Sequence, residues 1–130
     1  VVGDIKKSRS GSYLLSRTRS NPSLTQFFSY SLGEGRRAYL LKPYTGKTHQ
    51  LRVVMKSLGV PIFGDRRYGP TIQDSDRMYL HATALRFTFR GEEREYISLP
   101  KEGQLFADGG LAAALLDCQT PWALPWPSLN

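Results

Sequence analysis

The sequence predicts an α+β fold in which a mostly antiparallel mixed sheet is accompanied by a few short helices. The first observation is that two pairs of β-prone runs are each joined by a short link containing glycine. The second is a single segment between these pairs, residues 48–58, in which apolar residues recur with helical spacing. A chain of 130 residues can form one compact domain, or part of one.

The first segment, residues 1–21, is predicted to be a basic loop. It mixes lysines and arginines with serines, threonines and glycines, and it shows little apolar periodicity before Pro22. A solvated basic segment is the favoured interpretation, and a specific contact surface is the alternative. Because the chain begins at Val1 rather than at methionine, we expect it to be a fragment.

The predicted core, residues 22–100, begins with a β-hairpin. Apolar side chains occupy even positions, with mostly polar residues between them, at Leu24, Phe28, Tyr30 and Leu32. This period of two is typical of a half-buried strand. The glycine-bearing link 33–35 then leads to a second β-prone run, residues 37–42.

Residues 48–58 are predicted to form an amphipathic helix of roughly three turns. Its apolar stripe has the spacing i, i+3, i+4 and i+7, at Leu51, Val54, Met55 and Leu58. Thr48 is the expected N-cap, Gly59 the expected stop, and Pro61 prevents continuation.

A second hairpin is predicted within residues 78–99. Leu85, Phe87 and Phe89 alternate with polar residues, and after Gly91 a further alternating run follows. The alternation predicts a strand of the core. In the last segment, residues 101–130, we expect one small helix at 111–116 and then an irregular tail rich in proline.

The composition indicates which partners the chain can bind and which kinds of site it can form. The net charge of +7 and the isoelectric point near 9.8 favour a polyanion such as nucleic acid. Cys118 is the only cysteine, so an internal disulfide is excluded and a reducing, cytoplasmic location is expected. The two histidines have no metal-ligand spacing, and no apolar run has membrane length. We therefore expect no metal, no cofactor and no membrane insertion.

Three ordered motifs carry the most specific information. They are TGKTHQLR at residues 45–52, GDRRYG at residues 64–69, and YLHA at residues 79–82. Together they resemble the C-terminal motifs of the RluA-type pseudouridine synthases, which have Thr-Gly-Arg-Thr-His-Gln-Ile-Arg and Gly-Asp-x-x-Tyr-Gly. The resemblance implies the C-terminal portion of the pseudouridine synthase catalytic fold.

The resemblance also implies roles for individual residues. Arg52 matches the arginine that pairs with the catalytic aspartate, for which a guanidinium fork is well suited. Leu80 matches a leucine that lines the uracil pocket, although an ordinary core position is the alternative. Lys47 is expected to contact substrate phosphate or backbone carbonyls, and Arg66 and Arg67 are expected to meet phosphate or to be merely exposed. The family's His-Arg-Leu-Asp segment has no match in residues 1–39.

Other polar residues of the motifs are expected to be structural. His49 and Gln50 are predicted to hydrogen-bond the motif loop, with His49 as a general base the alternative. Asp65 follows a glycine in a turn, where aspartate most often accepts hydrogen bonds from nearby backbone amides. The string Gly-Lys-Thr at 46–48 lacks the first glycine of a P-loop, because Leu41 stands in its place.

The resemblance implies that the parent protein isomerises uridine to pseudouridine in ribosomal or transfer RNA. This chain lacks the catalytic aspartate segment, so we expect it to be inactive alone. One alternative is a non-catalytic RNA-binding module on the same fold, and another is a structural domain whose charge only maintains solubility. The sequence does not specify the target uridine. It does not specify the oligomeric state either, and a monomer is one of the alternatives.

Overall fold

The computed structural model describes residues 1–70, 74–107 and 109–129. The chain folds into two compact units, each made of two stretches of sequence. Unit 1 comprises Val1–Phe27 and Leu41–Tyr79, and unit 2 comprises Phe28–Leu40 and Leu80–Asn130. The antiparallel pairings and the two short α-helices confirm the predicted α+β class.

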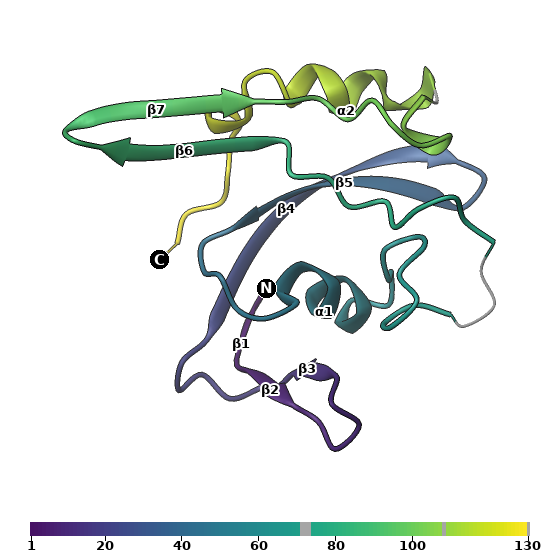
Figure 1. Ribbon diagram of the computed structural model, residues 1–130, viewed down its shortest axis with the longest axis vertical. Helices are drawn as coiled ribbons and strands as arrows, with labels where there is room; N and C mark the ends of the chain where they lie inside the picture. Colours follow the sequence, from purple (N-terminus) through teal and green to yellow (C-terminus); the bar gives the residue numbers. More distant parts are fainter. Residues whose placement is uncertain (71–73, 108, 130) are drawn as a thin grey trace. The chain divides into compact units, whose positions relative to one another are not determined.

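A three-stranded sheet with the order β1-β4-β5 contains the first predicted hairpin. Its strands are β1 (Val2–Gly3), β4 (Ser23–Gly33) and β5 (Arg36–Pro43) (Figure 1). The link between β4 and β5 has positive φ at Glu34 (54°) and Gly35 (72°), the backbone that a two-residue type I′ turn requires. The predicted hairpin is therefore confirmed.

Burial along β4 corrects part of the predicted alternation. From Phe28 onward the even positions are the more buried ones, as predicted, but in the first half the buried residues are Ser23, Thr25 and Gln26. Polar residues can be buried there because they find partners: the Ser23 hydroxyl donates to the Gly3 carbonyl, at 2.8 Å. A count of apolar residues cannot detect such hydrogen bonds.

Residues 1–21 form a small hairpin, where the sequence predicted a loop. Strands β2 (Ile5–Lys7) and β3 (Tyr13–Leu15) pair antiparallel, with Ile5 opposite Leu15 (Figure 1). The buried Asp4 organises the returning chain, because its carboxylate accepts hydrogen bonds from the groups Thr18 Oγ1, Ser20 N and Asn21 N. This single carboxylate supplies order where apolar periodicity is weak.

Helix α1 (Gln50–Ser57) lies in unit 1 and packs against β3. The predicted N-cap, Thr48, is wrong: the helix begins after His49, which has a left-handed backbone with φ 53°. The apolar stripe is also shifted, since the helix buries Gln50, Val53, Val54 and Met55, whereas Leu58 is exposed. Gly59, with φ 80°, ends the helix as predicted, its N–H bonding the Lys56 carbonyl.

In unit 2, β6 (Ala84–Phe89) and β7 (Glu92–Ile97) form the second predicted hairpin. The prediction that this strand belongs to the core is wrong, because its apolar side chains are 40% to 58% exposed at Leu85, Phe87 and Phe89. Alternation indicates that one face is apolar, but not that another layer covers it. On the opposite face Arg86 lies over the Trp122 ring, at 4.2 Å.

The C-terminal segment contributes short helical turns and α2 (Ala112–Asp117), close to the predicted helix. The 3₁₀ turns span Leu105–Ala107, Gly109–Leu111 and Pro121–Ala123. Tyr30 of β4 donates a hydrogen bond of 2.5 Å to Asp117, and Phe28 packs on Trp126 with ring centroids 4.6 Å apart. Cys118 is buried, as expected for a small apolar residue.

Candidate functional site

The motif at residues 45–52 is held in unit 1 by the side chain of Gln50. Its Oε1 accepts hydrogen bonds from Thr45 Oγ1 at 2.7 Å and from the Lys47 backbone N–H at 3.0 Å. Its Nε2 donates to the Leu24 carbonyl at 3.2 Å and to Thr25 Oγ1 at 2.9 Å. Gln50 is 5% exposed, so its side chain is buried, and its bond to Thr25 is fully buried. The structural interpretation of Gln50 is confirmed.

His49 occupies an unusual backbone conformation directly before α1. A non-glycine residue at φ 53° costs roughly 1–3 kcal/mol, so the surroundings must compensate. The ring is held on two sides: its Nδ1 lies 2.8 Å from the Tyr68 hydroxyl, and the Tyr13 ring packs on it edge to face at 5.7 Å. The structure thus explains His49 as a residue that fixes the entry to the helix.

The centre of the site is an ion pair between Arg52 of α1 and Asp65. Arg52 Nε donates to Asp65 Oδ2 at 2.9 Å, and Arg52 Nη2 donates to Asp65 Oδ1 at 2.8 Å. Both oxygens of the carboxylate therefore engage the same edge of the guanidinium, the bidentate geometry that fixes both groups. The Asp65 side chain is fully buried, whereas the Arg52 side chain is 22% exposed.

Asp65 stays ionised although burial opposes it. Burial raises the pKa of the carboxyl, but hydrogen bonds from Arg52 and from the backbone N–H groups of Tyr68 and Arg67 outweigh burial, and the pKa is lowered. The two backbone N–H groups donate to Oδ1 at 3.1 Å and 3.0 Å. The predicted role of Asp65, accepting bonds from nearby amides, is confirmed, but the sequence did not reveal its pairing with Arg52.

Two glycines allow the turn around Asp65. Gly64 has φ 85°, and a Cβ placed there would lie 1.9 Å from the Arg77 carbonyl oxygen. A Cβ at Gly69 would lie 2.5 Å from the Asp65 carbonyl oxygen, the same atom that accepts the Gly69 N–H. The GDRRYG motif therefore contains glycine for reasons of space at both ends.

One edge of the Arg52 guanidinium is left for another partner. Asp65 takes Nε and one N–H of Nη2, and among the residues that the structure describes no acceptor engages Nη1. The Tyr68 ring lies against the guanidinium, with 5.1 Å from Cζ to the ring centroid. Arg52 is thus held on one edge and one face, and it remains partly open to solvent.

The other predicted site residues are distributed over both units. Lys47, Arg66 and Arg67 belong to unit 1, and both arginines are exposed. Arg67 Nε donates to Ser12 Oγ at 3.2 Å. Leu80 belongs to unit 2 and is half-buried. The structure therefore brings Asp65 and Tyr68 into contact with Arg52, while Arg66 and Arg67 lie exposed on the same unit and Lys47 is half-buried there.

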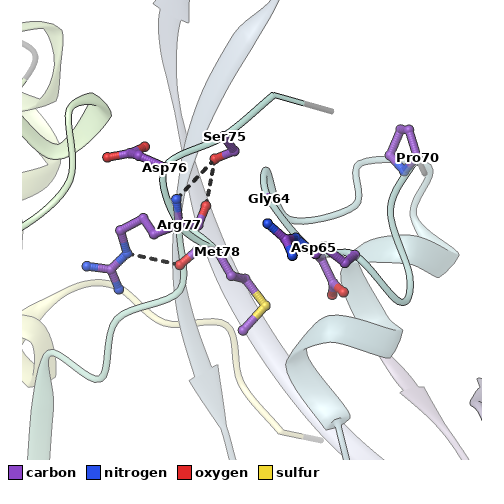
Figure 2. Close-up of a pocket in the computed structure, with 8 residues that line it drawn as sticks. Gly64, Asp65, Pro70, Ser75, Asp76, Arg77 and Met78 are labelled. Carbon is purple, nitrogen blue, oxygen red and sulfur yellow. Dashed lines mark hydrogen bonds between the residues drawn. The ribbon is translucent and has the colours of Figure 1, made fainter. Parts of the chain in front are cut away.

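A pocket of about 690 Å³ lies beside the Asp65 turn. Figure 2 shows the side chains that line it. Its lining includes two acidic and two basic side chains. The lining residues are Gly64, Asp65, Arg66, Pro70, Ser75, Asp76, Arg77 and Met78. The Ser75 hydroxyl donates to the Arg77 carbonyl at 2.6 Å, and Arg77 Nε donates to the Met78 carbonyl at 3.1 Å. These local bonds hold the wall of the pocket that faces Gly64.

Neither a metal centre nor a membrane span is found in the described part of the chain. No group of three or more His, Cys, Asp or Glu side chains gathers there as a metal site. Within the same residues, no helix combines the length and the apolar character needed to cross a bilayer.

Sequence reasoning missed two members of the site, Tyr68 and Tyr13. Tyr68 is 4% exposed, its hydroxyl contacts His49, and it accepts the Tyr13 backbone N–H at 3.0 Å. The signal for Tyr68 was its place in the GDRRYG motif. No comparable signal marks Tyr13, because the contact spans 55 residues and depends on the unpredicted β2–β3 hairpin.

Comparisons with known proteins identify the relatives of this chain. No family model matches it. The chain is 48% identical over 106 residues to a Haemophilus influenzae protein named "Uncharacterized RNA pseudouridine synthase", covering 82% of this chain and 47% of that protein. It is 45% identical over 67 residues to the dual-specificity RNA pseudouridine synthase RluA of Vibrio cholerae, covering 50% of this chain and 27% of that enzyme.

A solved structure agrees with these relatives. The human RNA Pseudouridylate Synthase Domain Containing 1 protein superposes with a TM-score of 0.64 at 30% identity, over 98% of this chain and 59% of that one. The chain therefore spans about half the length of the first curated relative that it matches. The resemblance found in the motifs is confirmed: the chain is homologous to the RNA pseudouridine synthases, RluA among them.

Proposed function

We propose that the full-length protein containing this chain is an RNA pseudouridine synthase that isomerises uridine in ribosomal or transfer RNA. The observation that carries the proposal is the anchored Arg52, whose Nη1 edge is left for a further carboxylate. The related proteins supply the reaction class, because they are named RNA pseudouridine synthases. No cofactor is required in this proposal.

In the proposed reaction the target nucleotide is flipped out of its stack. An aspartate from the remainder of the protein initiates cleavage of the glycosidic bond, the uracil rotates, and a ring carbon rejoins the ribose. Arg52 holds that aspartate in one rotamer and keeps it ionised by lowering its pKa. Leu80 provides an apolar wall for the uracil, and Lys47, Arg66 and Arg67 contact phosphates.

We further propose that residues 1–130 are inactive alone. The chain has no match to the His-Arg-Leu-Asp segment, and Asp65 cannot replace it, because both of its oxygens are engaged and its side chain is fully buried. A uridine isomerisation assay on this polypeptide should give no product above buffer. Turnover by the isolated chain would refute this and return Asp65 to consideration as the reacting carboxylate.

The proposed function is tested by mapping pseudouridine in ribosomal and transfer RNA from cells with and without the full-length gene. One site should be lost on deletion and restored by the wild-type gene, but not by an Arg52→Ala variant. A Lys56→Ala variant is the matched control, because Lys56 is an exposed cation on the same helix. If deletion removes no pseudouridine, the enzymatic proposal fails.

A non-catalytic RNA-binding module is the second candidate function. It is favoured by a specific observation: Asp65 already neutralises Arg52 within this chain, so the pair is stable without a catalytic partner. The two candidates differ in the complete gene. An aspartate in a His-Arg-Leu-Asp segment upstream of Val1 supports the enzyme, and its absence supports the binding module.

A further inference from the structure

Both the side chain and the backbone of Asp65 are held by hydrogen bonds. Oδ1 accepts two backbone N–H groups of its own turn, from Arg67 and Tyr68, in addition to one guanidinium N–H. The backbone of Asp65 is fixed as well, since its N–H donates to the Ile62 carbonyl at 3.0 Å and its carbonyl accepts the Gly69 N–H at 3.0 Å. The carboxylate is therefore a fixed point of unit 1.

Arg52 gains its orientation from this fixed point. An arginine side chain has several rotatable bonds, and ordering it costs up to roughly 2 kcal/mol of conformational entropy. Two parallel hydrogen bonds, at 2.9 Å and 2.8 Å, define the plane of the guanidinium as well as its position. The Tyr68 ring, itself held by its hydroxyl contact to His49, limits movement out of that plane.

We propose that Asp65 is the positioning residue of Arg52: it directs the Nη1 edge of the guanidinium toward a second carboxylate. This inference rests on the proposed function, in which the second carboxylate is the catalytic aspartate. Asp65 itself does not touch the substrate. It acts because a guanidinium anchored at Nε and Nη2 can still donate from Nη1, so one arginine bridges two carboxylates.

The first test measures kcat and KM of the full-length enzyme carrying Asp65→Asn. The amide keeps the size of the side chain and one oxygen for the backbone N–H groups, but it cannot accept two bonds from Arg52. We expect kcat to fall about 100-fold, the effect of a small misplacement of a catalytic group, while KM for RNA changes less than about threefold. An unchanged kcat would overturn the proposal.

Asp4→Asn is the matched control. Asp4 is also a buried carboxylate of unit 1 and also accepts two backbone N–H groups, but its side-chain partner is Thr18 rather than an arginine. A loss of kcat common to both variants would show that Asp65 matters only for general stability. We expect the loss with Asp65→Asn alone.

A double-mutant cycle with Arg52→Lys separates positioning from an independent role. Lysine keeps the charge but lacks the fork that bonds Asp65 on one edge. If Asp65 acts through Arg52, adding Asp65→Asn to Arg52→Lys should lower kcat by less than about threefold further. Multiplicative losses in the double variant would contradict the proposal.

An activity-independent measurement keeps the inference separate from the proposed function. In ¹⁵N NMR spectra of the full-length protein, the Arg52 Nε–H should exchange slowly with water in wild type and in Asp4→Asn, and faster in Asp65→Asn. Equal exchange in all three would overturn the positioning role even if the enzyme is active. Conversely, slow exchange in a wild-type protein that forms no pseudouridine would refute the function and retain the anchoring of Arg52 by Asp65.

Discussion

At the scale of single residues, Tyr68 connects Arg52 with His49 and Tyr13. Its ring lies against Arg52, and its hydroxyl contacts His49 Nδ1 and accepts the Tyr13 N–H. Tyr68→Phe keeps the ring but removes the hydroxyl that bonds His49 Nδ1 and the Tyr13 N–H. The free energy of unfolding should therefore fall by about 1–3 kcal/mol. Tyr96→Phe, at a side chain that is 56% exposed, should change stability by less than about 0.5 kcal/mol. Chemical denaturation of both variants checks this, and equal stabilities would contradict it.

The Asp65 carboxylate predicts a loss of stability in acid. Burial raises its pKa, but the bonds from Arg52 and the backbone amides of Tyr68 and Arg67 lower it further, so the folded pKa lies below the unfolded value of about 3.9. A group with a depressed folded pKa stabilises the protein above the unfolded pKa, and that stability is lost as the pH falls through the folded pKa.

The difference between wild type and Asp65→Asn isolates this contribution. The pKa of Asp4 is lowered as well, chiefly by the Thr18 hydroxyl, and Asp4 is present in both proteins. The free-energy difference from urea denaturation should be largest near pH 6 and shrink as the pH falls below about 4. A difference that is constant with pH would mean that Asp65 does not stabilise the fold as an ion.

At the scale of elements, the turn that carries Asp65 depends on Gly64. Gly64→Ala should destabilise unit 1 by about 3 kcal/mol, because the Cβ would lie 1.9 Å from the Arg77 carbonyl oxygen and φ is 85°. Gly59→Ala separates the two causes: φ is 80°, but no atom lies within 4 Å of the added Cβ, so the cost should be about 1 kcal/mol. Thermal unfolding of both variants tests whether Gly64→Ala is the more destabilising. Equal losses of stability would contradict the steric argument.

The elements also show what the sequence could predict. Both main hairpins and α1 followed from the period of their apolar residues, because that period is a local property of the chain. The start of α1 could not be predicted, since the left-handed backbone of His49, at φ 53°, is accompanied by ring contacts with Tyr68 and Tyr13 that the local sequence does not reveal. The exposure of Phe87 was missed for a similar reason: whether an apolar face is covered depends on distant residues.

For the candidate site, too, the sequence predicted individual residues but not the contacts between distant ones. Motif resemblance pointed to Arg52. The position of Asp65 after a glycine in a turn predicted that it bonds the backbone of its own turn, which the structure confirms. Their bidentate pairing was not predicted, because the resemblance assigned Arg52 to an aspartate outside this chain. The burial of Asp65, which makes a cationic partner favourable, depends on the tertiary fold and is not visible in the local sequence.

At the scale of the whole molecule, the excess of positive charge predicts salt-dependent binding to RNA. The net charge is +7, but the arginines are not equivalent. Two arginines of the β6–β7 hairpin are paired with glutamates: Arg86 contacts Glu93 and Glu95, at 3.0 Å and 2.9 Å, and Arg94 contacts Glu92 at 3.4 Å. Arg66 and Arg67 have no glutamate or aspartate side chain paired with their guanidinium groups among the described residues.

Because of this difference, the effect of net charge on RNA binding can be distinguished from the effect of individual arginine positions. Replacing Arg66 and Arg67 together by glutamine should weaken RNA binding and reduce the slope of log K against log salt by about 1–2, because up to two phosphate contacts are lost. Replacing Arg86 and Arg94 by glutamine removes the same charge, but it should leave that slope nearly unchanged, since these arginines already neutralise glutamates. Fluorescence anisotropy with the full-length protein at several salt concentrations measures both slopes. If the two variants lose affinity equally, the basic surface acts only through its net charge, and Arg66 and Arg67 do not form a phosphate-binding site.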